Sequence, residues 1–317
     1  MDLVFIFCGI ALLSLGGEAL IRGALGAANK YQVSPLMAGI LIVGFGTSAP
    51  ELAVSVDATL KGSQDIAIGN VVGSNIGNIL LILGLCAIIR PLTIQRRALQ
   101  RDATSALLST LLCCLLMSLG LLNLVGGLTL ISGLCLYLLW VYITEKSEQI
   151  PSAVMHVNEA KEVQRYPTHW LSLIAFVIAG LAMMLSGSHF LLKGASSVAI
   201  SLGISEATVG LTIVAVGTSF PELSISIIAV IRKHVDVAIG NVLGSNIFNI
   251  LGILGIASVL DPLAPTSRII NYDMWAMLVC AIALLILLWS TKKIHRATGA
   301  LMLTLYATYS WVGIQYY

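Results

Sequence analysis

The chain has 317 residues, of which 58% are hydrophobic and only 10% are charged. An average soluble domain carries about 25% charged residues, so this composition excludes an ordinary soluble fold and indicates a protein of the lipid bilayer. The net charge of +2 gives no reason to expect nucleic acid as a partner.

Charged residues, prolines and glycines divide the chain into ten apolar segments. Each approaches or exceeds the length of about 20 residues that crosses a bilayer as a helix. The alternating polarity of a transmembrane β-barrel is absent from the sequence. The predicted spans are 3–26, 35–60, 66–89, 103–120, 122–143, 169–200, 206–230, 237–259, 273–290 and 298–315.

Five spans precede a polar stretch at 144–168 and five follow it, so the second half must enter the membrane from the opposite side. The sequence therefore predicts an all-α polytopic membrane protein, with ten transmembrane helices as two inverted-topology five-helix repeats. The first repeat covers 1–143, the stretch 144–168 is a cytoplasmic connector, and the second repeat covers 169–317.

The positive charges predict the orientation. With an external N-terminus, the cytoplasmic side receives 14 of the 17 Lys and Arg residues, and the outside keeps only Lys61, Lys193 and Arg268. Cytoplasmic loops of membrane proteins are enriched in Lys and Arg. We therefore expect a multi-pass protein of the cell (inner or plasma) membrane with both termini external.

The two halves share one motif. Residues 46–84 read GTSAPELAVSVDATLKGSQDIAIGNVVGSNIGNILLILG, and residues 217–255 read GTSFPELSISIIAVIRKHVDVAIGNVLGSNIFNILGILG. At a constant offset of 171, 24 of these 39 positions are identical, so the chain is an internal duplication. Matching hydrophobic segments interrupted by Gly and Pro indicate the binding site of a secondary transporter.

Each copy places a glutamate, Glu51 or Glu222, well inside an apolar span. A carboxylate at that depth costs at least about 2.5 to 3.5 kcal/mol, and such residues mark ion pathways. Neither copy has a Lys or Arg at comparable depth, so a bound cation or a proton must neutralise the charge.

Pro50 and Pro221 precede these glutamates and lack the N–H that a helix needs. We expect the prolines to free backbone carbonyls around Gly46 and Gly217, and such irregular backbone survives in a membrane only where it is buried or lines a cavity. Helical spacing puts further oxygens on the face of each glutamate. These are the hydroxyls of Thr47 and Ser48 beside Glu51, and of Thr218 and Ser219 beside Glu222.

The second part of each copy, GNVVGSNIGN or GNVLGSNIFN, makes a polar stripe on an apolar helix. Amide and hydroxyl side chains also hold membrane helices together. We favour that structural role for Asn70, Asn75, Asn241 and Asn246, and ion binding for Ser74, Asn78, Ser245 and Asn249.

The two carboxylates with their hydroxyls, amides and carbonyls form an all-oxygen site of formal charge −2. Such a site suits calcium, whereas zinc or copper favours His or Cys. Sodium is a hard ion of nearly the same size, so competing ions can use the same oxygens.

Other ionisable residues are weaker candidates. Asp57 has Ile228 at the matching position, and we interpret it as a solvated helix end in preference to a vestibule residue. Asp65 and Asp236 recur just before a span, where negative charge stabilises a helix N-terminus. Glu18 and Arg22 are spaced as a structural ion pair.

With GTSAPE and GNVVGSNIGN in one copy and GTSFPE and GNVLGSNIFN in the other, the chain resembles the cation/calcium exchanger superfamily, and most of all the prokaryotic sodium/calcium exchangers of the YrbG type. The resemblance implies four central helices packed around the ions, with the first and sixth spans as a sliding gate. It implies that Glu51 and Glu222 bind calcium together with the backbone carbonyls of Thr47 and Thr218. Six residues are implied in sodium sites: Ser48, Ser74, Asn78, Ser219, Ser245 and Asn249.

We therefore expect an electrogenic antiporter that exchanges sodium for calcium by alternating access, with no cofactor and no obligate protein partner. Several relatives have Asp where this chain has Asn249, and its absence argues against potassium dependence. The alternative is a calcium/proton antiporter. Proton-coupled relatives place an acid directly after the Gly-Asn pair, where this chain has Val71 and Val242. An intramembrane hydrolase is disfavoured because no histidine accompanies the polar stripes, and the inverted duplication disfavours a passive channel.

Overall fold

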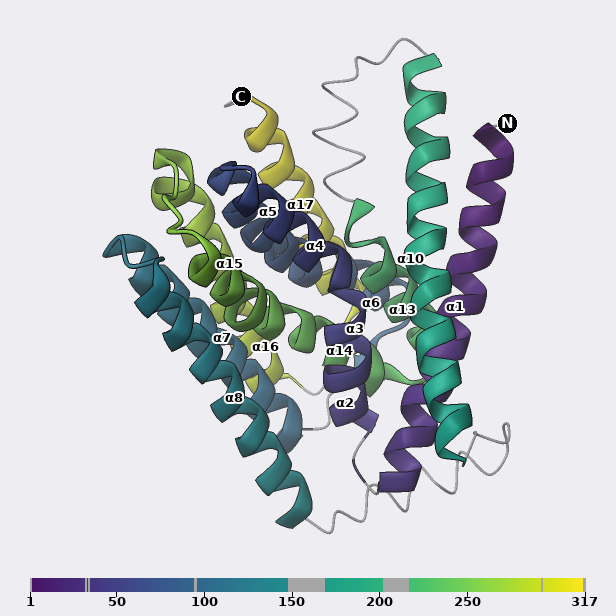
Figure 1. Ribbon diagram of the computed structural model, residues 1–317. Helices are drawn as coiled ribbons and strands as arrows, with labels where there is room; N and C mark the ends of the chain where they lie inside the picture. The colour runs from purple at the N-terminus through teal and green to yellow at the C-terminus, as the bar shows by residue number, and fades with distance from the viewer. Residues whose placement is uncertain are drawn as a thin grey trace.

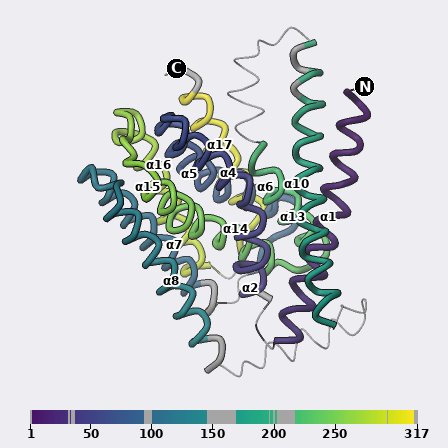
Figure 2. The backbone as a smooth tube through the Cα atoms, viewed as in Figure 1, coloured from purple at the N-terminus to yellow at the C-terminus, as the bar shows by residue number. Residues whose placement is uncertain are grey.

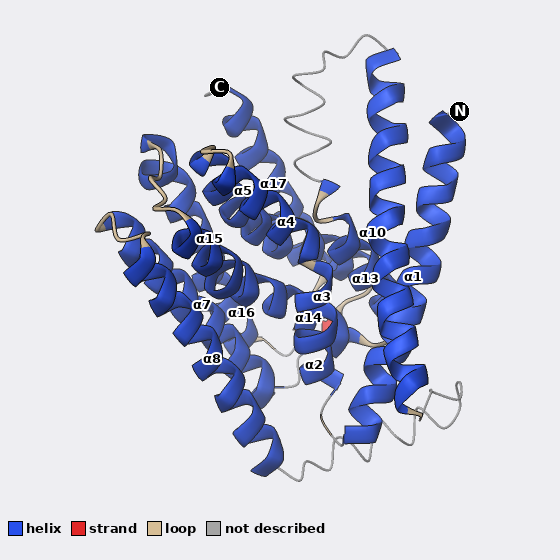
Figure 3. Cartoon of the chain, in the orientation of Figure 1, coloured by secondary structure: helices blue, strands red, loops and turns tan. Residues whose placement is uncertain are grey.

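The chain is almost entirely helical in a computed structural model that describes residues 2–31, 33, 35–93, 96–147, 169–201, 217–291 and 293–315 (Figure 3). Six described helices are long and apolar enough to cross a membrane. A seventh span results if Gly39–Thr47 and Ala49–Leu60, bent by 45° at their junction, form one broken span. The protein is thus a multi-pass helical membrane protein.

The helices of the first half follow most of the predicted spans. They are α1 (Asp2–Tyr31), α2 (Pro35–Ala38), the π-helix η1 (Gly39–Gly44), α3 (Phe45–Thr47), α4 (Ala49–Leu60), α5 (Gln64–Gly77), the π-helix η2 (Asn78–Ile82), α6 (Leu83–Ile89), α7 (Arg96–Ser118) and α8 (Leu124–Ser147). α7 begins at Arg96, well before the predicted position 103.

The described helices of the second half repeat this order. They are α10 (Trp170–Ser201), α13 (Phe220–Ile231), α14 (Val235–Phe248), the π-helix η4 (Asn249–Leu254), α15 (Gly255–Leu260), the π-helix η5 (Ile269–Asp273), α16 (Met274–Ser290) and α17 (Arg296–Gln315). The start of the predicted span 206–230, up to residue 216, and most of the predicted connector, 148–168, lie outside the described residues. The start of α1 and the end of α17 lie at the same end of the bundle (Figure 1).

α1 and α10 form an antiparallel pair at one side of the molecule (Figures 1 and 2). Their contact is built on glycines seven residues apart on each helix, namely Gly9, Gly16 and Gly23 on α1 and Gly180, Gly187 and Gly194 on α10. A Cβ added at Gly16 would lie 2.8 Å from the Gly180 carbonyl oxygen, and one at Gly187 would lie 2.8 Å from the Leu13 nitrogen. Small residues allow this backbone approach in membranes, so the two helices form one tightly packed unit.

The core contains α4, α5, α13 and α14, with α7 and α16 packed together beside them. α14 crosses η1, and a Cβ at Gly244 would lie 2.7 Å from the Ile40 carbonyl oxygen. Short backbone links tie the halves together. β1 (Leu92–Thr93) pairs antiparallel with β2 (Lys293–Ile294). The Leu263 nitrogen donates to the Leu122 carbonyl at 2.7 Å.

Candidate functional site

The helix of each motif copy is broken just before its glutamate. Ser48 separates α3 from α4 with φ −79° and ψ 10°, and Ser219 precedes α13 with φ −86° and ψ 8°. Pro50 and Pro221 then occupy the first turn of the new helix, where a missing N–H costs nothing. The interruption expected from the two prolines is therefore present in both copies.

The two carboxylates are buried, and each accepts a hydrogen bond from the opposite copy. Glu51 and Glu222 are both 1% exposed. Ser219 Oγ donates to Glu51 Oε1 at 3.1 Å, and Ser48 Oγ donates to Glu222 Oε1 at 3.1 Å. The second oxygen of each carboxylate, Oε2, has no hydrogen-bond partner. The serines thus join the two motifs directly at the acids.

Asparagines at the ends of α5 and α14, and at the starts of η2 and η4 that follow them, bind one another across the two copies in matching pairs. Asn78 Nδ2 donates to Asn246 Oδ1 at 2.9 Å, and Asn249 Nδ2 donates to Asn75 Oδ1 at 3.1 Å. The amides of Asn75 and Asn246 each donate to the other's backbone carbonyl at 3.3 Å. These bonds fit the structural role expected for Asn75 and Asn246. They also leave Oδ1 of Asn78 and of Asn249 buried without a partner.

Two further asparagines fix the backbone at the glutamates. Asn70 Nδ2 donates to the Glu51 carbonyl at 3.1 Å and to Ser55 Oγ at 2.9 Å. Asn241 Nδ2 donates to the Glu222 carbonyl at 3.1 Å and to Ser226 Oγ at 2.8 Å. Ser55 and Ser226 were not singled out from the sequence, although each recurs at the 171-residue offset and that recurrence could have identified them.

The oxygens without partners suit a cation. Among the described residues, the buried side-chain atoms without a hydrogen bond include five oxygens of the predicted site residues: Glu51 Oε2, Glu222 Oε2, Asn78 Oδ1, Asn249 Oδ1 and Thr218 Oγ1. Buried oxygens are costly unless something binds them. No group of three or more His, Cys, Asp or Glu side chains gathers within the described ranges. The five free atoms are all hard oxygen donors of the kind that calcium binds.

The two halves of the site differ at their threonines. Thr47 Oγ1 donates to Asn241 Oδ1 at 3.2 Å, whereas Thr218 Oγ1 has no partner. The Gly44 carbonyl accepts from Ser48 Oγ and from Ser245 Oγ, both at 3.0 Å. Two hydrogen bonds, Thr47 to Asn241 and Ser245 to Gly44, thus join the half that contains Thr47 to the other motif copy. Ser74, the counterpart of Ser245, is also buried.

The weaker candidates lie outside this cluster. Asp57 forms an exposed ion pair with Lys61, which agrees with the solvated helix end. Asp65 and Asp236 lie in the first turns of α5 and α14, so they can stabilise those termini without acting as the cap residues. Glu18 pairs with Arg22 as predicted.

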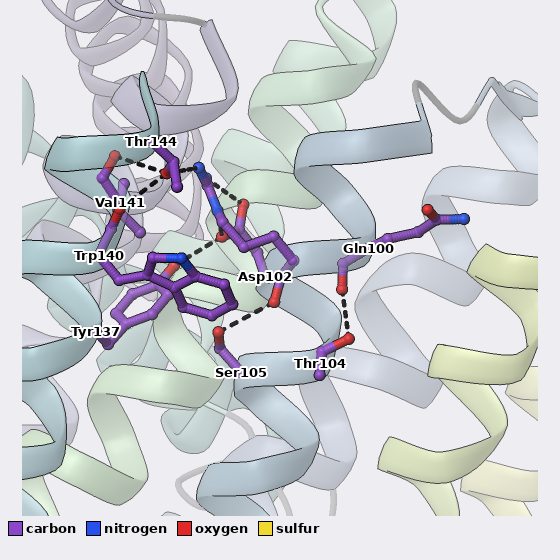
Figure 4. Close-up of polar contacts among 9 residues, drawn as sticks. Gln100, Asp102, Thr104, Ser105, Tyr137, Trp140, Val141 and Thr144 are labelled. Atoms are coloured by element: carbon purple, nitrogen blue, oxygen red, sulfur yellow. Dashed lines mark hydrogen bonds and ion pairs between the residues drawn. The ribbon is translucent and has the colours of Figure 1, made fainter. Parts of the chain in front are cut away.

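Two buried aspartates were not recognised from the sequence. Asp102 on α7 accepts hydrogen bonds from Arg101 Nε at 2.7 Å and from the Tyr137 hydroxyl of α8 at 3.3 Å (Figure 4). Asp273, 171 residues later, accepts from Arg268 Nε at 3.1 Å and from the Tyr309 hydroxyl of α17 at 3.0 Å. These clusters tie each helix of the α7 and α16 pair to the helix that follows it. Comparison of the halves beyond the motifs could have revealed them.

The chain is similar to known membrane proteins over nearly its whole length. The family described as "Sodium/calcium exchanger protein" matches residues 1–144 and 172–315. The inner membrane protein YrbG of Escherichia coli (strain K12) is 31% identical over 93% of this chain and 91% of its own. The sodium/calcium exchanger MaX1 of Methanosarcina acetivorans is 28% identical over 98% of this chain and 97% of its own.

The fold agrees with a solved structure of this kind. The sodium/calcium exchanger from Methanococcus jannaschii superposes with a TM-score of 0.81 at 31% identity, over 97% of this chain and 96% of that one. The sequence resemblance and the helical membrane fold are thereby confirmed. The chain belongs to the sodium/calcium exchanger protein family.

Proposed function

We propose that the protein is a secondary active antiporter that exchanges sodium for calcium across the cell membrane by alternating access. The observation that carries the proposal is the pair of buried glutamates, each bound through one oxygen to a serine of the other copy and left with a second oxygen free. Two such carboxylates need a bound cation or a proton whenever they are enclosed in the bilayer.

Calcium binds Glu51 and Glu222 together with Thr47 and Thr218 in this proposal. Sodium uses the surrounding oxygens of Ser48, Ser219, Ser74, Ser245, Asn78 and Asn249. Support comes from the free Oδ1 atoms of Asn78 and Asn249 for sodium and from the free Oε2 atoms of Glu51 and Glu222 for calcium, which would bind the backbone carbonyls of Thr47 and Thr218 as well. Because Ser48 and Ser219 of the proposed sodium sites hydrogen-bond to the glutamates, the sites adjoin and calcium and sodium compete, and the conformational change is favoured only when the carboxylates are loaded.

Ten spans in two inverted repeats, with both termini external, provide the frame for this exchange. The matching cross-bonds of the two motifs and the antiparallel α1 and α10 support the arrangement. Exchange of about three sodium ions for one calcium ion, as the family resemblance implies, moves net charge and couples transport to voltage at about 2.3 kcal/mol per charge per 100 mV. Asn249 in place of an aspartate supports potassium independence.

The test is calcium-45 uptake into sodium-loaded proteoliposomes diluted into sodium-free buffer. We expect uptake that needs the sodium gradient and ignores potassium and pH gradients. Glu51→Gln and Glu222→Gln should each lower it by at least about a hundredfold, the effect of losing about 2.7 kcal/mol of ion binding. Asp57→Asn, an exposed acid on the same helix as Glu51, is the matched control and should transport normally. Uptake driven by a pH gradient alone would assign the protein to calcium/proton exchange.

A further inference from the structure

Ser188 is a buried hydroxyl to which the proposed ion site gives no role. It lies on α10, is 5% exposed, and its Oγ donates to the Gly217 carbonyl oxygen at 2.9 Å. A helical serine usually bonds to the carbonyl four residues earlier on its own helix. Ser188 instead reaches the first residue of the second motif copy, on a different segment of the chain.

The carbonyl that Ser188 binds is the one that Pro221 leaves without a helical donor. In a continuous helix, the Gly217 carbonyl would accept from the backbone nitrogen of residue 221, and proline has no hydrogen there. Neighbouring helices and Ser or Thr side chains satisfy such freed groups in membranes. Ser188 therefore caps the break that creates the second half of the site.

The two residues after Gly217, Thr218 and Ser219, belong to the proposed ion site. Thr218 has a free buried hydroxyl, and Ser219 Oγ donates to Glu51 Oε1 at 3.1 Å. A bond that fixes the Gly217 carbonyl also fixes the backbone that carries both side chains. α10 lies close against this point, because a Cβ at Gly217 would overlap the side chain of Leu192.

The described residues of the first half show no counterpart of this bond. The residue that matches Ser188 at the 171-residue offset is Gly17 on α1, which has no side chain to donate. Gly17 instead faces the side chain of Ile228 on α13. Among the described residues, the helix pair thus hydrogen-bonds to a motif break in the second copy only, whereas its contact with the first break is apolar, through Leu181 of α10 against Gly46.

We propose that Ser188 is a positioning residue for ion binding, whose hydroxyl on the α1 and α10 pair holds the Pro221-freed carbonyl of Gly217 in place for the second half of the site. This rests on the proposed function, because it assumes that the motif binds the transported ions. Loss of the hydroxyl weakens ion binding without removing any ligand. Movement of the helix pair would break the same bond, so ion affinity depends on the position of α10.

The test compares purified full-length variants by thermal-shift titration with calcium chloride and with sodium chloride, followed by calcium-45 uptake in sodium-loaded proteoliposomes. Ser188→Ala should raise the half-saturating calcium concentration about threefold to tenfold, the effect of one lost hydrogen bond, while the maximal uptake rate stays within about twofold. Ser188→Thr keeps the hydroxyl and should restore binding. Ser186→Ala, at an exposed serine on the same helix, should match wild type.

Equal half-saturating concentrations for Ser188→Ala and Ser186→Ala would overturn the positioning role, as would a failure of Ser188→Thr to restore binding. If Ser188→Ala does not fold, Ser188→Cys, a weaker donor of similar size, serves in its place and should bind calcium more weakly than Ser188→Thr. If neither calcium nor sodium raises the unfolding temperature of the wild-type protein, the proposed function and the role of Ser188 are both overturned. If the wild-type protein binds and exchanges the ions but Ser188→Ala and Ser186→Ala have the same half-saturating calcium concentration, only the role of Ser188 is overturned.

Discussion

The core of the molecule makes equivalent hydrogen bonds in the two motif copies, whereas the outer α1 and α10 pair binds the two copies in different ways. In the core, most bonds come in matched sets, such as Ser48 to Glu222 with Ser219 to Glu51. The α1 and α10 pair instead makes unmatched contacts with the core. α10 donates from Ser188 to Gly217, and α1 places Glu18 against Arg232.

Under the proposed function, the difference separates the part assigned to ion binding from the part assigned to the conformational change. A site shared by both copies keeps its geometry when its bonds are reciprocal. A helix pair that moves between two positions cannot contact both copies equally in either position. Under the proposed alternating access, unequal contacts are expected at the moving element. The free Thr218 hydroxyl and the bonded Thr47 hydroxyl show that the difference reaches the edge of the site.

The largest expected effect is on the free energy of unfolding, when the two matching asparagines of the core are replaced. Asn241 makes three side-chain hydrogen bonds, to Thr47, Ser226 and the Glu222 backbone, whereas Asn70 makes two. At about 1 kcal/mol for each bond, Asn241→Ala should lower the free energy of unfolding by about 3 kcal/mol and Asn70→Ala by about 2 kcal/mol. Chemical unfolding of both variants in one detergent measures the difference, and equal losses would show that the Thr47 bond contributes nothing.

A somewhat smaller effect is expected where the helix pair is packed most closely. Gly16→Ala places a Cβ 2.8 Å from the Gly180 carbonyl and 2.9 Å from Met183 Cβ. Overpacking of this kind costs about 1 to 3 kcal/mol. Gly133→Ala is the matched control, because its Cβ would lie 3.5 Å from the Leu251 side chain. Thermal unfolding should distinguish the two, and a neutral Gly16→Ala would contradict the tight packing of α1 on α10.

The sequence predicted the membrane fold, the broken motif helices and the residues of the candidate site because each leaves a local pattern. Pro50 and Pro221 have one backbone consequence wherever they occur in a helix. The π-helices that begin at Asn78 and Asn249 could not be predicted in this way. Their backbone hydrogen bonds span five residues instead of four, and that change depends on how the helices pack. Such π-helical turns are frequent at functional sites.

Side-chain contacts between different helices could not be predicted from the sequence either. The Ser188 bond to Gly217 and the clusters around Asp102 and Asp273 need three-dimensional proximity that no spacing encodes. The offset of 171 residues shows that Asp102 and Asp273 correspond, but only the structure shows that a tyrosine of the next helix binds each one.

The smallest expected effect concerns the ion pair that joins α1 to the end of α13. Glu18 Oε1 lies 2.9 Å from Arg22 Nε, and its Oε2 lies 3.0 Å from Arg232 Nε. The Arg232 side chain is 50% exposed, so solvent screens the attraction and the pair contributes less than about 1 kcal/mol. His189 stands at the position that matches Glu18, and a histidine cannot attract a lysine such as Lys61, the counterpart of Arg232.

A double-mutant cycle of Glu18→Gln and Arg232→Gln isolates this contribution. We expect a coupling free energy of about 0.5 kcal/mol in thermal unfolding at low ionic strength. It should vanish in 1 M choline chloride, where the Debye length falls to about 3 Å. Choline is used because sodium would occupy the proposed ion sites. The matched cycle of His189→Gln and Lys61→Gln should give no coupling. Coupling of equal size in both cycles would mean that the helix pair is attached alike to both copies, and the contrast between core and helix pair would then rest on Ser188 alone.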